Sequence, residues 1–355
     1  MLLHIGTYTE PLPHVAGHGQ GIYTYRFDPA AGACELLGVA AEMRNPSYLA
    51  LNRRGDRLYA VQETEAGDGP DLCAYAVDSA RGRLTLLGCQ EAGGSGGACH
   101  LLVNENADIV IVAYYSTGGV GVYPLRADGR LGAIAQVVQH SGHSVNAERQ
   151  EGPHAHGVIL DRSGRFLFVT DLGMDKVMVY RLEAGRLVPH EPPFAPVAAG
   201  AGPRHAVVHP NNRFVYVVNE LDSTVTVFSH TEGVLQERQT LSALPDDFGG
   251  ESWCGEIRIT GSGRFVYASN RGHDSIVIFA CDPEDGLLTP LGHESTQGRT
   301  PRDFALTPGD AYLLAANQDS DTVVVFEVNG ENGQLRPTGR AIDVPSPASV
   351  VMMEE

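Results

Sequence analysis

A unit of about fifty residues recurs along this chain of 355 residues, and the repeat restricts the folds that the chain can adopt. The clearest copies begin at Pro203, Cys254 and Pro301, and they align without gaps over eighteen residues. Fainter copies begin at residues 46, 98 and 155, so that neighbouring copies start 47 to 57 residues apart, and a seventh start falls at Pro347. Repeats of this period predict a solenoid or a propeller.

The pattern within each copy indicates strands. A short apolar run comes first, a turn at Gly or Asn follows, and a second run is rich in Val, Phe and Tyr. A third run, such as Thr224–His230, leads through an Asp/Gly turn to a weaker fourth one, such as Gly286–Ser295. β-Branched and aromatic residues in short runs favour strands, and no long helical periodicity competes. We therefore predict an all-β, seven-bladed β-propeller of four-stranded antiparallel blades.

The two ends of the sequence predict how the ring closes. The seventh copy contains only a first strand, Ala348–Met352, while residues 2–10, 21–28 and 34–43 supply three further strands. One blade made from the C-terminal strand and these N-terminal strands removes the free sheet edges. We expect residues 1–355 to form a single β-propeller domain.

The charge and the apolar runs exclude several partners. Lys plus Arg number 25 against 43 Asp plus Glu, which gives a net charge of -18 and disfavours nucleic acid and anionic membranes. No apolar run reaches the roughly 18 residues that a membrane span needs. An anionic substrate must therefore be attracted by local basic groups. We expect a monomer or a small homo-oligomer.

The cysteines and the N-terminal residues bear on the compartment. The sequence MLLHIGTYTE reads as a strand and has no basic and apolar regions of a secretory signal. The six cysteines are scattered without a CxxC pair. We therefore expect reduced thiols and a cytoplasmic location.

Blade geometry predicts where a site lies. The first strand of a blade starts on one face of the disc and the second ends on that face, so residues at both points converge at one mouth of the channel. Arginines bind carboxylate or phosphate, and histidines exchange protons near neutral pH. The polar residues at these points suit an anionic small molecule; they include Arg204, Arg271, Arg302, His100, His154, His156, His205, Asp171, Glu220, Asn270 and Gln318.

Several plainer interpretations stay open. Four histidines, His140, His143, His154 and His156, fall within seventeen residues, so a zinc site is conceivable although no ligand motif supports it. Arg204 and Arg302 could pair only structurally with Glu220 and Asp303, and His156 could be only a hydrogen-bonded structural residue. Trp253, the single tryptophan, is interpreted as a packing anchor rather than a substrate platform.

Two segments outside the strands are also ambiguous. The connector Ser141–Gly157 is either a lid at the site face or a tolerated insertion. His14 and His18 belong to a Gly/Pro-rich loop that we interpret as solvent-exposed.

The run GAGPRHAVVHPNNRFVYVVNELDSTVTVF, Gly200–Phe228, resembles the bacterial seven-bladed propeller lactonases of the cycloisomerase-2-type 6-phosphogluconolactonase family. Gly152–Arg181, Ser252–Phe279 and Thr300–Val328 are similar to the same pattern, so the resemblance covers essentially the whole chain. The family includes the fungal carboxymuconate lactonizing enzyme.

The resemblance implies a lactone enzyme without metal or cofactor, and it implies catalytic roles for His156, Arg204 and Glu220. In the third repeat, this chain has HAH where the enterobacterial branch has one histidine in a CHSAN-like stretch.

These observations together predict hydrolysis of a sugar lactone, with 6-phosphogluconolactone favoured as substrate. Glu220 or His156 is the expected base, and Arg204 the expected ligand of the oxyanion or carboxylate. The distant phosphate or carboxylate and the rest of the substrate are expected on His154, His205, Asn270, Arg271, Arg302 and Gln318. The alternatives are a carboxymuconate-type cycloisomerase, a lactonase for an unphosphorylated sugar acid, and a non-catalytic binding propeller.

Overall fold

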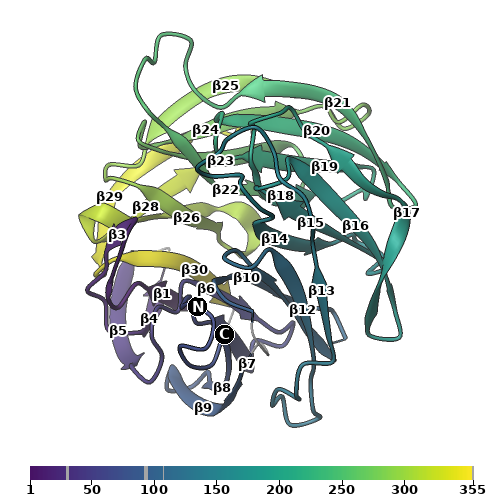
Figure 1. Cartoon of the computed structure of the whole chain (residues 1–355). Coiled ribbons are helices and arrows are strands. Elements are labelled where there is room, and N and C mark those ends of the chain that lie inside the picture. The colour runs from purple at the N-terminus through teal and green to yellow at the C-terminus, as the bar shows by residue number, and fades with distance from the viewer. Residues whose placement is uncertain (29–31, 92–94, 107, 354–355) are drawn as a thin grey trace.

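Seven four-stranded antiparallel sheets surround a common centre in the computed structural model, which describes residues 1–28, 32–91, 95–106 and 108–353 (Figure 1). The predicted seven-bladed β-propeller is thereby confirmed. Six blades each use four consecutive strands, numbered here from blade 1 (β6 to β9) to blade 6 (β26 to β29). Each of these blades begins within two residues of a start in the sequence repeat.

The strands of blades 1 to 3 are β6 (Tyr48–Leu51), β7 (Arg57–Val61), β8 (Leu72–Asp78), β9 (Arg83–Gln90), β10 (Ala98–Val103), β11 (Ile109–Tyr114), β12 (Gly119–Pro124), β13 (Gln136–Gln139), β14 (Ala155–Leu160), β15 (Phe166–Asp171), β16 (Lys176–Glu183) and β17 (Arg186–Pro196). Those of blades 4 to 6 are β18 (Pro203–Val208), β19 (Phe214–Asn219), β20 (Thr224–Thr231), β21 (Val234–Ser242), β22 (Trp253–Ile259), β23 (Phe265–Arg271), β24 (Ser275–Cys281), β25 (Leu288–Ser295), β26 (Pro301–Leu306), β27 (Tyr312–Asn317), β28 (Thr322–Val328) and β29 (Leu335–Asp343). Two short 3₁₀ helices, η1 (Pro308–Asp310) and η2 (Gln318–Ser320), lie in blade 6.

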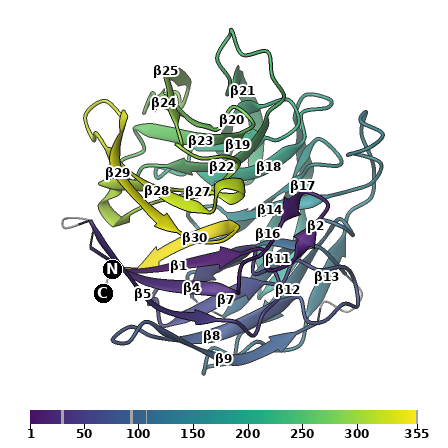
Figure 2. The same cartoon turned by 90° about the vertical axis from the view of Figure 1, so that its left-hand side faces the viewer.

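The closing blade joins the two ends of the chain, as the sequence predicts. Its strand order is β30 (Pro347–Met353), β1 (Leu2–Thr7), β4 (Ile22–Asp28) and β5 (Ala33–Ala40). β30 pairs antiparallel with β1 (Figure 2), and in this register Ile5 lies opposite Val350. The innermost strands of all seven blades contact one another in an unbroken circle, with β30 between β26 and β6. The ring therefore has no free inner edge.

The hydrophobic core is divided among the interfaces between neighbouring blades. Seven apolar clusters each combine residues from two adjacent blades. In the cluster between blades 4 and 5, for example, Tyr216 and Val218 pack with Ile257 and Phe279. Alternate residues of one strand face opposite neighbours, so the inner strands are apolar on both faces.

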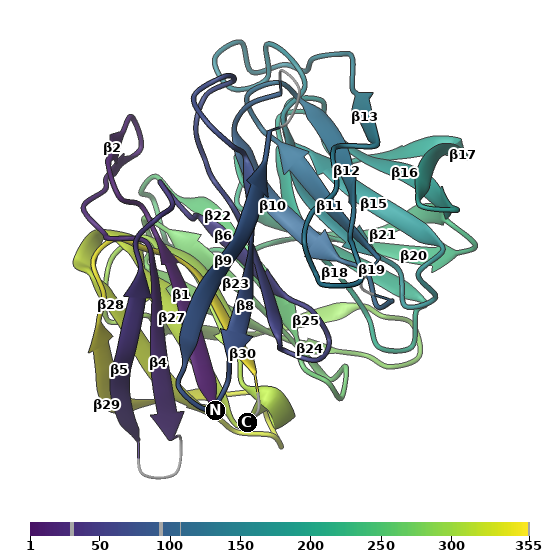
Figure 3. The same cartoon turned by 90° about the horizontal axis from the view of Figure 1, so that it is seen from below.

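A small hairpin marks the face that carries the site. β2 (Pro11–Leu12) and β3 (Val15–Ala16) pair with each other between β1 and β4, and Val15 packs on Tyr8 and Ala348. Figure 3 shows this hairpin projecting from the side of the disc opposite the two termini. His14 at its turn is thereby held over the mouth of the channel.

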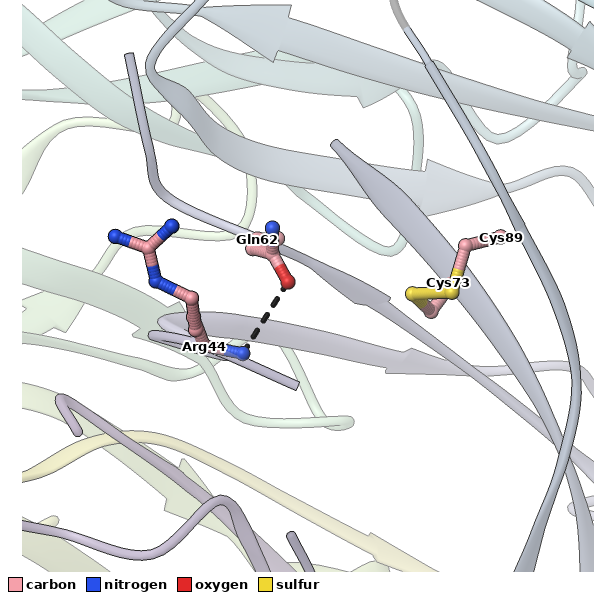
Figure 4. The surroundings of a disulfide bond; sticks show 4 residues. All are labelled: Arg44, Gln62, Cys73 and Cys89. Atoms are coloured by element: carbon pink, nitrogen blue, oxygen red, sulfur yellow. Dashed lines mark hydrogen bonds between the residues drawn. A yellow bond between two sulfur atoms is a disulfide. The ribbon is translucent and has the colours of Figure 1, made fainter. Parts of the chain in front are cut away.

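The cysteines depart from the expectation of reduced thiols. Cys73 and Cys89 form a disulfide between β8 and β9, where they lie directly opposite each other in the antiparallel register (Figure 4). Cross-strand opposition brings two side chains together whatever their spacing in the sequence, so the lack of a CxxC pair did not argue against it. The other four cysteines, Cys34, Cys99, Cys254 and Cys281, are free thiols.

No helix among the described residues is long and apolar enough to cross a membrane.

Candidate active site

One mouth of the central channel holds a cavity of about 720 Å³ to which all seven blades contribute. Its lining residues follow the chain around the ring: Leu12, Pro13, His14, Glu63, Thr64, Glu65, Gly97, Cys99, Tyr115, Ser116, Arg149, His156, Glu220, Trp253, Arg271, Gly272, Thr300, Arg302, Gln318 and Asp319.

Equivalent repeat positions supply much of this lining. The eighteenth residue of a repeat, at the end of its second strand, is Glu63, Tyr115, Glu220, Arg271 or Gln318 in five of the six full copies, and all five line the cavity. In the third copy, the same position is the buried Leu172. The convergence of strand ends at one mouth, which blade geometry predicts, is therefore seen in the structure.

A bulge at the start of the first strand positions the other functional side chains. In blade 3, Ala155 pairs with Asp171 and Gly157 with Thr170, so that His156 has no partner in the ladder. The same irregularity leaves Cys99, Arg204 and Arg302 unpaired in blades 2, 4 and 6. A bulge turns the extra residue out of the regular alternation. His156 and Arg302 thereby reach the cavity from strands whose neighbouring residues serve the core.

Glu220 is the centre of a buried charge cluster. Its Oε1 lies 2.6 Å from Nη2 of Arg149, and its Oε2 lies 2.7 Å from Nη2 of Arg271 and 3.2 Å from Nε of Arg204. The side chain of Glu220 is only 6% exposed, so these ion pairs are screened little by water. Two of the three guanidinium groups, those of Arg149 and Arg271, also line the cavity.

The cluster fixes the protonation of its members. Burial alone raises the pKa of Glu220, but the charges of Arg271, Arg204 and Arg149 outweigh burial and hold this pKa well below its usual range. Burial, together with the charges of Arg204 and Arg302 and despite the opposing effect of Glu220, lowers the pKa of Arg271 to about 10. At neutral pH, Glu220 is therefore an anion that accepts protons poorly.

His156 is the titratable base beside Glu220. Its Nε2 lies 3.8 Å from Oε2 of Glu220, and its Nδ1 lies 3.8 Å from Sγ of Cys99. Burial, with the charge of Arg204 next in importance, holds the pKa of His156 well below its usual range. The imidazole is therefore neutral at pH 7, with a lone pair available to a ligand in the cavity.

Arg204 occupies the floor beneath Glu220 and does not line the cavity. Its Nη1 donates to the carbonyl oxygen of Gly255 at 2.7 Å and lies 3.1 Å from Nδ1 of His205. Its own carbonyl accepts a hydrogen bond from Thr170 at 2.5 Å, and a side chain at Gly157 would collide with that carbonyl. The close approach of blades 3 and 4 at a glycine thus holds Arg204 in place.

Arg302 has a different environment, although it is the counterpart of Arg204 in blade 6. Its guanidinium carbon lies 5.1 Å from the centre of the Tyr8 ring, a cation–π geometry. Within the described part of the chain, no hydrogen bond or ion pair engages its guanidinium. Arg302 is thus a cavity cation whose donors are available to a ligand.

The remaining predicted substrate residues divide into two groups. Gln318 lines the cavity and donates to Oδ1 of Asp319 at 2.8 Å. His154, His205 and Asn270 lie outside the lining. His154 stacks on Tyr115, His205 binds Glu256 at 2.8 Å inside the channel, and Asn270 donates to the Ala243 carbonyl at 2.7 Å.

The structure separates the four histidines considered as zinc ligands. His140 binds Asp171 at 2.6 Å, His143 is exposed, and His154 and His156 face Tyr115 and Glu220. The described residues contain no group of three or more His, Cys, Asp or Glu side chains that could hold a metal.

Three lining residues were missed or misjudged from the sequence. Arg149 comes from the connector Ser141–Gly157, whose neighbour Gln150 is fully buried and donates to the Leu172 carbonyl and to Asp175 at 2.8 Å. His14 is 44% exposed, as the loop interpretation predicts, but it also lines the cavity. Trp253 is 41% exposed at the rim and is not a packing anchor. The sequence did hold a signal for Trp253, because it directly precedes the fifth repeat, where the first strand starts at the site face opposite Arg271.

Comparison with known proteins agrees with this geometry. A family model described as "Lactonase, 7-bladed beta-propeller" matches residues 2–352. The chain is 36% identical over 311 residues to a 6-phosphogluconolactonase of Bacillus subtilis, covering 87% of this chain and 86% of the relative. It is 30% identical over 318 residues to a 6-phosphogluconolactonase of Formosa agariphila, covering 87% of each.

Solved structures include a close match. The periplasmic gluconolactonase of Pseudomonas aeruginosa superposes with a TM-score of 0.91 at 35% identity, over 99% of both chains. The seven-bladed propeller fold is thus shared with lactone enzymes. The chain belongs to the seven-bladed β-propeller lactonase family.

Proposed function

We propose that this lactonase hydrolyses 6-phosphoglucono-δ-lactone to 6-phosphogluconate, with Arg302 holding the phosphate. The observation that carries the phosphate assignment is the free guanidinium of Arg302 in a cavity whose other arginines, Arg149 and Arg271, are already bound to Glu220. Two relatives that are named 6-phosphogluconolactonases support the same substrate.

Of the two bases left open by the sequence, His156 is the one proposed as general base. Glu220 is a poor proton acceptor because three arginines hold it as an anion, whereas His156 is neutral at pH 7. Nε2 of His156 takes a proton from water as the water oxygen bonds to the lactone carbonyl carbon. Glu220, 3.8 Å away, stabilises the imidazolium that forms.

Collapse of the tetrahedral intermediate completes the reaction. The bond between the carbonyl carbon and the ring oxygen breaks, and His156 returns its proton to the departing alkoxide. The carboxylic acid product then ionises. Arg271 and Arg149 are the proposed ligands of the developing oxyanion, because both line the cavity and each contacts Glu220 through Nη2 alone, which leaves other donors of the guanidinium for the oxyanion.

The role of Arg204 changes accordingly. It was expected to contact the oxyanion, but it lies behind Glu220 and donates to Gly255. We assign it as a positioning residue that orients Glu220 and lowers the pKa of His156. Hydrolysis of unphosphorylated gluconolactone is the second candidate, which the Pseudomonas relative favours.

The test is a pH-stat assay of freshly prepared 6-phosphoglucono-δ-lactone and glucono-δ-lactone, corrected for spontaneous hydrolysis. We expect the wild type to prefer the phosphorylated lactone and Arg302→Ala to lose about 10- to 100-fold in kcat/KM on that substrate alone, since a charge-assisted contact is worth roughly 1.5–3 kcal/mol. Arg299→Ala, an exposed neighbour, is the control. Equal turnover of both lactones by the wild type would leave the second candidate.

Location and assembly form a separate part of the proposal. All seven blades of one chain complete the cavity, which supports a monomer or small homo-oligomer that needs no partner at the site. A cytoplasmic location was expected, yet the Cys73–Cys89 disulfide and the periplasmic relative favour an oxidising compartment. Cell fractionation of the natural host, with the disulfide state assayed in each fraction, decides between them.

A further inference from the structure

The cavity has an acidic wall that the proposed mechanism does not use. The lining arginines and His156 come from blades 3, 5 and 6 and from the connector before blade 3, whereas Glu63 and Glu65 come from blade 1, beside His14 of the closing blade. Glu63 and Glu220 occupy the same position in their repeats, three blades apart around the ring. The two carboxylates are thus related by the repeat but differ in what surrounds them.

Glu63 retains an acceptor that Glu220 lacks. Oε2 of Glu63 accepts a hydrogen bond from the hydroxyl of Tyr8 at 2.9 Å. Oε1 lies 3.8 Å from Nε2 of His14, too far for a hydrogen bond, and no other described residue donates to it. The side chain of Glu63 is 16% exposed, so this oxygen is largely shielded from bulk water but lines the cavity.

The other acidic residues of the lining have no shielded carboxylate oxygen that lacks a hydrogen-bond donor. Both carboxylate oxygens of Glu220 bind arginines. Asp319 accepts from Gln318 at 2.8 Å and from Thr300 at 2.5 Å. Glu65 is exposed to solvent at the rim. Glu63 is therefore the interior carboxylate with unused hydrogen-bonding capacity.

The chemistry of this wall selects its ligand. A carboxylate accepts hydrogen bonds and repels phosphate and carboxylate groups, so its partner is a neutral donor or a cation. A cation would also meet Arg302, which lies over the ring of Tyr8, the residue bound to Glu63. The side chain of His14 is 44% exposed and adds no charge at neutral pH, because partial desolvation and the charge of Arg302 lower its pKa to about 4. A hydroxyl group fits these surroundings best.

We propose that Glu63 is a specificity-determining residue whose carboxylate, held by Tyr8, binds hydroxyl groups of the substrate and so selects polyhydroxylated lactones. This inference rests on the proposed lactone hydrolysis but not on the phosphate. It also disfavours a carboxymuconate lactone, whose additional carboxylates would be repelled by Glu63. Arg302 and Glu63 would then bind neighbouring parts of one sugar acid, the anionic group and the hydroxyls.

The test compares two lactones of equal ring size, glucono-δ-lactone and δ-valerolactone, which carries no hydroxyl groups. Glu63→Ala is expected to lower kcat/KM on glucono-δ-lactone about 10- to 100-fold and to leave δ-valerolactone within about 2-fold of wild type. Glu63→Gln, which keeps an acceptor for Tyr8, is expected to show a smaller loss with the same selectivity. Glu148→Gln, an exposed acid of the connector, is the charge-matched control.

A binding measurement separates this inference from the proposed function. Trp253 is the only tryptophan and lies at the cavity rim, so its fluorescence reports occupancy without turnover. D-gluconate and hexanoate share a six-carbon carboxylate and differ in hydroxyls. We expect the wild type to bind D-gluconate more tightly, Glu63→Ala to lose that difference and Glu63→Gln to reduce it.

Two results would contradict the assignment of Glu63 as a ligand of hydroxyl groups. Equal losses on both lactones, or none on either, would overturn the assignment of Glu63. Should the wild type hydrolyse neither lactone, the proposed function fails, and D-gluconate titration of the folded variants still decides whether Glu63 binds hydroxyls.

Discussion

His156 shows how one residue is tuned by its neighbours. Burial and Arg204 keep its imidazole neutral, while Glu220 lies close enough to stabilise the charged form during turnover. The imidazole is therefore unprotonated at neutral pH, and it stays unprotonated as the pH falls to mildly acidic values. The same arginine orients Glu220 and depresses the pKa of His156, so the two effects are linked.

The pH dependence of kcat/KM should reveal this tuning. Because the pKa of His156 lies well below 6.5, activity should stay level from pH 8 to below 6.5 and fall only under more acidic conditions. Arg204→Met removes one cause of the lowered pKa, so its acidic limb should move upward toward 6.5. Arg204→Lys keeps the charge and should keep the limb near that of the wild type. An unmoved limb in Arg204→Met would contradict the proposed role of His156.

The site residues were predictable where the repeat places them. His156, Glu220, Arg271, Arg302 and Gln318 occupy strand ends that the alignment identifies, and all five line the cavity. Arg149 and His14 come from segments outside the repeat, where no spacing predicts position. Their places depend on long-range contacts, such as the packing of the hairpin on Ala348, that no local pattern encodes.

The bulge in the first strand of a blade directs functional side chains from the scaffold toward the site. Period-two alternation predicts that successive residues of β14 or β26 face opposite blades, and it has no place for an extra residue. The bulge supplies that residue to the cavity lining in blades 2, 3 and 6, and beneath Glu220 in blade 4. The strand and the place of His156 and Arg302 at the mouth were therefore predictable from the sequence, but the bulge that turns their side chains was not.

The hairpin of β8 and β9 carries the disulfide, which should stabilise blade 1. The bridge spans 16 residues, and a closed loop of that size is worth about 3 kcal/mol. Cys73→Ala with Cys89→Ala should therefore lower Tm by about 4 °C in calorimetry, since the shift for a given free energy is small in a large chain. Cys34→Ala, a free thiol, is the control.

Thiol titration provides an independent check. The denatured wild type should show four reactive thiols before reduction and six afterwards. Six thiols without reductant in freshly isolated protein would contradict the bridge.

At the scale of the whole molecule, the ring should unfold as one unit. Every blade shares an apolar cluster with each neighbour, and the closing blade links β30 to β1 through Ile5 and Val350. Ile5→Ala should cost about 2–5 kcal/mol at this closure. We expect one cooperative transition at a lower Tm, with circular dichroism and Trp253 fluorescence changing together.

The two probes report on distant parts of the ring. Trp253 lies in blade 5, away from the substitution, while circular dichroism reports on all blades. An early transition in circular dichroism with Trp253 melting at the wild-type temperature would show that the ring consists of separate units. Ile278→Ala, in the core between blades 5 and 6, is the matched substitution.

The fold was almost fully predictable from the sequence, down to the closing blade, because six aligned copies repeat the same pattern of strands. A single copy would not have sufficed, since each strand alone is short. The disulfide is the exception, because it depends on register between two outer strands that the repeat describes weakly.

Closure by β30 has a consequence for the synthesis and folding of the chain. A ribosome makes the chain from its N-terminus, so β1, β4 and β5 are synthesised first and must wait for the last strand to complete their blade. His14 at one end of the sequence and Asp319 near the other line one cavity. We therefore expect a nascent chain that lacks blade 6 and β30 to have an incomplete cavity and no catalytic activity.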